Sequence, residues 1–120
     1  MELLFVTDPL ETFKTYKDST FAMMREAQRR GHSIHVCEPR HMRWERGGLV
    51  QAQTRSIALT GDAKDWFTEV AHPVRAIKNF GAVVMRKDPP FDSEYFYATH
   101  LLEQAEREGA RVFNKPRALR

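Results

Sequence analysis

The sequence predicts a single α/β domain: a mainly parallel sheet flanked by helices, with an inserted β-hairpin. Three observations lead to this prediction. Apolar segments of strand length alternate with segments of helical periodicity along most of the chain. The run Leu3–Val6 is apolar at every position, which is typical of a strand covered on both faces. A length of 120 residues suits one hydrophobic core and therefore one domain.

The first third of the chain predicts a strand, a helix and a second strand, which together make one βαβ unit. After the first apolar strand, a polar stretch leads to a helix from Asp18 or Ser19 to Arg30. Both starting residues are good N-caps, and Gly31 stands where a helix would end. The apolar stripe of this helix consists of Thr20, Phe21, Met24 and Ala27. The alternating segment Ser33–Cys37 is the second strand.

The middle of the chain predicts a hairpin followed by a segment of weak pattern. The segments Met42–Glu45 and Leu49–Ala52 flank the pair Gly47-Gly48, which suits a tight turn between two strands. Residues 53–80 show little periodicity. Within them, Trp66, Phe67 and Val70 are candidates for a strand, and Val74 to Phe80 for a short helix entered after Pro73.

The last third predicts a strand, a long helix and a final short strand. The apolar run Ala82–Met85 is the strand, and the helix extends from Asp92 to Glu108 until Gly109 ends it. Its apolar stripe consists of Tyr95, Ala98, Leu102 and Ala105. The segment Arg111–Phe113 forms the last strand. From the apolar faces of the predicted elements, we expect Phe21, Met24, Val84 and Leu102 to be buried.

Composition excludes several functional classes. The formal net charge is +3, and the positive excess is shared by both halves of the chain, so nucleic-acid binding is not expected. No stretch approaches the roughly 18 apolar residues of a membrane span, and the N-terminus is charged too early for a signal peptide. The single cysteine, Cys37, excludes an internal disulfide and suits a reducing cytosol.

The usual nucleotide and metal motifs are missing from the sequence. No glycine precedes Gly31, so the first strand is not followed by a glycine-rich phosphate loop. Four residues that can bind metals lie close together in the sequence: His32, His35, Cys37 and His41. A metal site is one interpretation, because His35 and Cys37 share one face of a strand. Structural zinc sites have tighter, repeated spacing, so a strand with one buried cysteine and surface histidines is the favoured interpretation. Nothing nearby indicates an activated Cys37 thiolate.

The segment between the strand ending at Met85 and the last helix is the most informative for function. It leaves the carboxyl end of a strand and enters a helix N-terminus, where α/β domains bind ligands and anions. Arg86 could bind a carboxylate with two hydrogen bonds, and Asp88 could orient Arg86 or accept from an ammonium group. Pro89-Pro90 would keep the loop rigid. The alternative is an ordinary strand-to-helix turn with solvated charges.

A second loop of the same kind leads into the first helix. If the two strands that precede the helices are neighbours, both helix N-termini open onto one crevice. Lys17, Asp18 and Ser19 would then face Arg86 and Asp88 across it. The alternative is a solvated lysine beside an ordinary N-cap.

Several segments of this chain resemble bacterial glutathione synthetase, and they extend over its whole length apart from a looser region at about 40–80. The run Met85–Asp92 is the most specific of them. The others are Leu4–Val6 with Asp8-Pro9, Lys17–Met23, Glu26–His32, Tyr97–Thr99, Leu102-Glu103 and Asn114–Pro116.

The resemblance implies that residues 1–120 are the Rossmann-like, pre-ATP-grasp N-terminal domain of such a ligase, with the ATP-grasp domain absent from this chain. The complete cytoplasmic enzyme would join γ-glutamylcysteine to glycine through an acyl phosphate, using ATP and Mg²⁺, and release glutathione. The domain alone would be inactive and would bind no cofactor. It would form one wall of the peptide site and part of a homo-oligomer interface.

On this interpretation, the expected substrate-binding residues are Lys17, Asp18, Ser19, Arg86 and Asp88, with no catalytic or metal-binding residue in this chain. Two other classes stay open. One is a non-catalytic α/β module that binds a γ-glutamyl peptide. The other is a structural module that docks the rest of its chain or a second copy.

Overall fold

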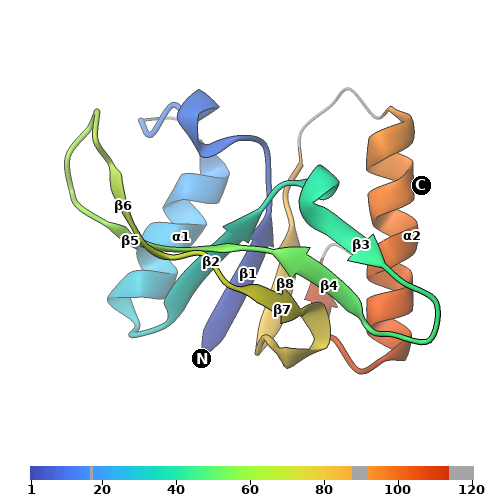
Figure 1. Cartoon of the computed structure of the whole chain (residues 1–120). Helices are drawn as coiled ribbons and strands as arrows, with labels where there is room; N and C mark the ends of the chain where they lie inside the picture. The colour runs from blue at the N-terminus through green and yellow to red at the C-terminus, as the bar shows by residue number, and fades with distance from the viewer. Residues whose placement is uncertain (17, 88–91, 114–120) are drawn as a thin grey trace.

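The computed structural model describes residues 1–16, 18–87 and 92–113, and it confirms the predicted α/β class. A six-stranded sheet lies at the centre, with one long helix on each side (Figure 1). A smaller three-stranded sheet packs beside the second helix. Within the described residues, no helix has the length and apolar character needed to cross a bilayer.

The central sheet combines a parallel half with an antiparallel extension. Its strand order is β6-β5-β2-β1-β8-β9. The strands are β1 (Glu2–Val6), β2 (Ser33–Cys37), β5 (Arg55–Leu59), β6 (Phe67–Ala71), β8 (Ala82–Met85) and β9 (Val112–Phe113). The four strands β2, β1, β8 and β9 are parallel, as predicted, whereas β5 and β6 are antiparallel to their neighbours.

The predicted hairpin is present, and it gains a third strand that the sequence did not indicate. It consists of β3 (Met42–Trp44) and β4 (Val50–Gln53), and β4 also pairs with β7 (Val74–Ala76). The prediction of a short helix from Val74 to Phe80 is therefore wrong. Only Ile77–Asn79 form a single 3₁₀ turn. A helix of so few residues is marginal, whereas the strand completes an antiparallel ladder on β4.

Both predicted helices form, and their ends follow from local chemistry. Helix α1 spans Ser19–Arg29, and the Asp18 carboxylate caps its first turn. Helix α2 spans Ser93–Arg107, and the Asp92 carboxylate accepts a hydrogen bond from the Tyr95 backbone N–H at 2.9 Å. The residues that end the helices, Gly31 and Gly109, have φ values of 87° and 115°, a conformation that glycine adopts without strain. Two further 3₁₀ turns occur at Leu10–Thr12 and Pro39–His41.

The core has two halves, one on each face of the central sheet. Leu4 of β1 and Val83 of β8 pack with Leu102 of α2 on one face. Phe5 of β1 and Val84 of β8 pack with Met24 of α1 on the other. Alternate residues of each strand therefore serve opposite helices, which explains why these strands are apolar throughout. Burial of Met24, Val84 and Leu102 is confirmed.

Phe21 differs from the prediction because it is only partly buried. Its ring meets the Trp66 ring edge-on, with 5.3 Å between the centroids. Trp66, which lies just before β6, is buried and packs into the core on the α1 side of the sheet. The ring of Phe21 therefore lies at the border of the core, not within it.

The connections place a topological switch point between β1 and β8. The chain leaves β1 through α1 and returns at β2, on one side of β1 in the sheet. It leaves β8 through α2 and returns at β9, on the other side of the sheet. Right-handed crossovers in opposite directions put the two helices on opposite faces, as observed (Figure 1). Ligands of open α/β sheets bind at the carboxyl edge of such a switch point.

His35 corrects the expectation of surface histidines on β2. The residue is 5% exposed, and its ring packs edge-on against Phe80. Nε2 lies 3.4 Å from both the Glu2 carboxylate and the Ser33 hydroxyl. Nδ1 is buried and has no hydrogen-bond partner among the described residues. Burial lowers the pKa of His35 below its usual 6.5, although the Glu2 carboxylate opposes the shift.

We expect this histidine to make the domain less stable in mild acid. Its folded pKa lies below its unfolded pKa, so the unfolded state binds more protons between the two values. The contribution of neutral His35 to the free energy of unfolding is complete above pH 6.5 and is lost as the pH falls. It weakens by at most about 1.4 kcal/mol per pH unit, the slope for one proton.

Urea denaturation between pH 5 and 7.5 would measure this effect, with His35→Leu as the comparison. The pKa of His41 is also lowered by burial, and that group remains in both proteins. The difference between the two stability curves therefore reports His35 alone. Parallel curves would contradict the prediction.

Candidate functional site

The carboxyl edge of the sheet, at the switch point between β1 and β8, carries polar residues at the ends of both strands. Thr7 and Asp8 follow β1, and Arg86 and Lys87 follow β8 (upper edge of the sheet in Figure 1). The Arg86 backbone N–H donates to the Val6 carbonyl at 2.8 Å, which continues the parallel ladder past the end of β8. The backbone on both sides of the switch point is therefore held together.

The Arg86 side chain lies against the start of α1. Its Nε donates to the Thr20 hydroxyl at 3.2 Å, and its Nη2 donates to the Ser19 hydroxyl at 2.6 Å. These residues are more than 60 positions from Arg86 in the chain. The structure thus brings Arg86 and Ser19 together, two of the residues that the sequence analysis placed opposite each other. Lys17, Asp88 and the following prolines lie outside the described residues, so their predicted positions in this crevice stay predictions.

The Asp18 carboxylate caps the backbone of the same helix turn. Its Oδ1 accepts from the Thr20 N–H at 2.8 Å and from the Phe21 N–H at 3.3 Å. These bonds satisfy two of the backbone donors that a helix start leaves unpaired. Asp18 therefore fixes the turn that carries the two hydroxyls facing Arg86.

A second pair of charges at this edge was missed in the sequence. The Lys87 ammonium lies 2.8 Å from the Asp8 carboxylate, and their side chains are only 16% and 23% exposed. The available signal was that each residue comes second after a strand end. Two neighbouring parallel strands bring such positions side by side.

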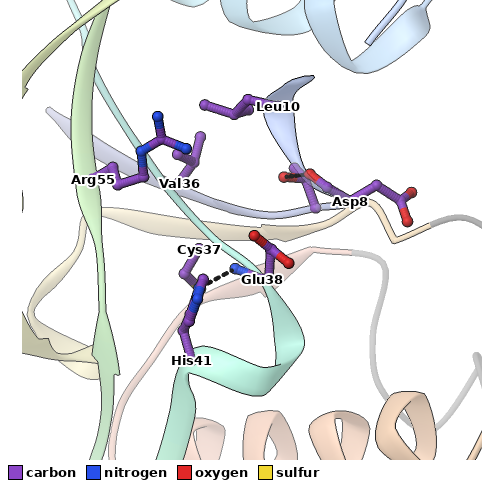
Figure 2. A pocket seen from close by; sticks show the side chains of 8 residues that line it. Asp8, Leu10, Val36, Cys37, Glu38, His41 and Arg55 are labelled. Carbon is purple, nitrogen blue, oxygen red and sulfur yellow. Dashed lines mark hydrogen bonds between the residues drawn. The ribbon is translucent and has the colours of Figure 1, made fainter. Parts of the chain in front are cut away.

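A small hollow opens beside this edge, at the ends of β1 and β2 (Figure 2). It is lined by Thr7, Asp8, Leu10, Val36, Cys37, Glu38, His41 and Arg55. The Glu38 backbone N–H donates to His41 Nδ1 at 3.1 Å, so the neutral ring carries its proton on Nε2. The hollow has a cavity volume of only about 10 Å³, far below the usual range of ligand pockets.

Cys37 contributes to the floor of the hollow but offers no nucleophile. The side chain is buried, and burial raises the pKa of its thiol to about 12. The thiol therefore stays protonated at neutral pH, and a protonated thiol is a poor nucleophile.

The described residues show neither of the arrangements typical of a nucleotide site or a metal site. The segment that follows β1 contains no glycine up to α1, and glycine is what lets the backbone approach phosphate closely. In the ranges that the structure describes, no three His, Cys, Asp or Glu side chains come together as metal ligands would.

Comparisons with known proteins agree over the full length of the chain. The family model described as "Prokaryotic glutathione synthetase, N-terminal domain" matches residues 1–120. Proteins named glutathione synthetase from Ralstonia nicotianae, Vibrio cholerae and Neisseria meningitidis serogroup B are 53%, 45% and 44% identical to it. All of this chain is covered in each comparison, but only 37%, 37% and 39% of those relatives. The chain thus spans little more than a third of the length of the curated relatives it matches.

Proposed function

The chain belongs to the prokaryotic glutathione synthetase N-terminal domain family, and on this premise we propose that it serves a ligase that joins γ-glutamylcysteine to glycine. The resemblance that the sequence indicated is thereby confirmed. The whole-length match to the family supports the activity, which we assign to the longer protein that carries this domain. We further propose that this protein is cytoplasmic and self-associates.

The proposed role of this domain is to hold the peptide from one side. The observation that carries this role is the position of Arg86, at the switch point and against the start of α1. A guanidinium matches a carboxylate in shape and stays charged at any working pH. We propose that Arg86 binds a carboxylate of γ-glutamylcysteine or glycine. Ser19, Asp18, Lys17 and Asp88 belong to the same proposed site.

We place ATP and Mg²⁺ in the remainder of the longer protein, the ATP-grasp domain. There they would activate the cysteinyl carboxylate as an acyl phosphate, which the glycine amine attacks to form the amide of glutathione. The lack of a glycine-rich loop after β1 supports this division of labour. This domain would contribute by orienting the peptide, and correct positioning alone can lower a barrier by several kcal/mol.

We expect the full-length protein to release ADP only when γ-glutamylcysteine, glycine and Mg²⁺ are all present. The 120-residue domain alone should release none, because its first strand is not followed by a glycine-rich phosphate loop. A coupled assay for ADP, with glutathione measured by chromatography, would test both statements.

Omission of glycine is the matched control, since it removes the amine that the acyl phosphate needs, and with it both glutathione and steady-state release of ADP. Stimulated ADP release by the purified domain would contradict the proposed division. A full-length protein that binds γ-glutamylcysteine without ligating it would instead indicate a binding module.

A further inference from the structure

Two neighbouring cations at the switch point have partners of different kinds. The Lys87 ammonium lies beside a carboxylate, that of Asp8, at 2.8 Å. The Arg86 guanidinium lies beside two hydroxyl groups. A carboxylate partner cancels a positive charge, whereas a hydroxyl oxygen accepts a hydrogen bond and leaves the charge intact. Arg86 is therefore the cation of this edge whose described partners leave its charge intact.

The hydroxyls also select which edge of the guanidinium is occupied. Arginine carries five N–H donors in a planar fork. Nε and one N–H of Nη2 point along its side edge, and these two donors go to Thr20 and Ser19. The end of the fork, with Nη1 and the second N–H of Nη2, is a parallel pair of donors that suits the two oxygens of a carboxylate.

We propose that Ser19 and Thr20 are positioning residues, whose hydroxyls hold the Arg86 guanidinium end-on for the carboxylate of the substrate. This inference rests on the proposed function. It changes the role of Ser19 from a direct ligand of the substrate to a group that acts through Arg86. It also adds Thr20, which the sequence placed only in the apolar stripe of α1.

The fold makes this arrangement rigid. Thr20 is 6% exposed, so its side chain has little freedom to turn away from Arg86. The Asp18 carboxylate holds the Thr20 backbone N–H at 2.8 Å, which fixes the first turn of α1. The Arg86 backbone is in turn bonded to the end of β1. Arg86 is thus anchored to the central sheet, and the two hydroxyls to the capped first turn of α1.

The test uses the full-length synthetase with Ser19→Ala, Thr20→Val and the double variant. Each removes a hydroxyl at nearly constant shape. We expect the double variant to raise the KM for γ-glutamylcysteine or for glycine about tenfold or more, with the KM for ATP unchanged. Thr20→Ser should restore the wild-type value. Thr99→Val is the matched control, because Thr99 is also a buried helical threonine but bonds the Phe96 carbonyl within α2.

A double-mutant cycle with Arg86→Ala separates positioning from direct contact. If the hydroxyls act through Arg86, their removal should have no further effect on KM once Arg86 is gone. Equal effects in both backgrounds would overturn the inference, as would wild-type KM values in the double variant. Failure of the proposed function looks different: the wild-type full-length protein would then not ligate at all.

Discussion

Leu102→Ala should lower the free energy of unfolding of the domain by about 2–5 kcal/mol. Leu102 is 0% exposed and lies on α2 in the core that the helix shares with β1 and β8. Truncation removes three buried carbon atoms and leaves a cavity that the packed strands cannot readily fill. The cost combines the lost burial with this cavity.

Urea or thermal denaturation of the isolated domain would measure the change. Leu49→Ala is the matched control, because Leu49 is exposed in the hairpin and loses the same atoms. We expect that variant to change stability by less than about 0.5 kcal/mol. Similar losses for both variants would show that the packing of α2 is not as described.

Local signals were enough to predict the helices and the parallel strands. The apolar run Leu3–Val6 becomes a central strand because it is covered by helices on both faces, and the same holds for β8. The ends of the helices depend on single residues, such as the caps Asp18 and Asp92. Such features act within one turn of the chain and are visible in sequence.

The elements that sequence analysis missed depend on distant partners. β5 and β7 are short and weakly patterned, and both are strands because they pair with β2 and β4. Thr54 and Pro73 immediately precede these two strands. The buried Thr54 hydroxyl donates to the Pro73 carbonyl at 2.8 Å and so links the two segments. His35 was expected at the surface for a similar reason, since Phe80 packs against its ring only in the folded chain.

The candidate site could be predicted in outline and not in its contacts. The rule that strand ends and helix starts meet at one edge was sufficient to place Arg86 opposite Ser19. Which donor meets which acceptor depends on the register of β1 against β8 and on the rotation of α1. The Asp8–Lys87 pair follows from the same register, so pattern alone did not reveal it.

If the full-length protein is the proposed ligase, Arg86→Ala in it should raise the KM for γ-glutamylcysteine or glycine far more than the KM for ATP. We expect kcat/KM for the affected substrate to fall by about 30- to 1000-fold, which corresponds to about 2–4 kcal/mol of lost transition-state stabilisation. The reason is that a charged, two-point contact with a carboxylate would be lost at the switch point, where Ser19 and Thr20 hold the guanidinium in place. Arg86→Lys should recover only part of the activity, because lysine keeps the charge and lacks the planar fork.

Steady-state kinetics with each substrate varied in turn would check this result, with Arg107→Ala as the matched control. Arg107 is an exposed arginine in the last turn of α2, far along that helix from its N-terminus at the candidate site, and its Nε donates to Gln104. Its loss should leave all three KM values unchanged.

Arg86→Ala should also keep the wild-type melting temperature within a few degrees, since its guanidinium bonds only two hydroxyls among the described side chains. Near-wild-type kinetics at an unchanged melting temperature would mean that the substrate carboxylate binds elsewhere. Arg86 would then only link β8 to α1.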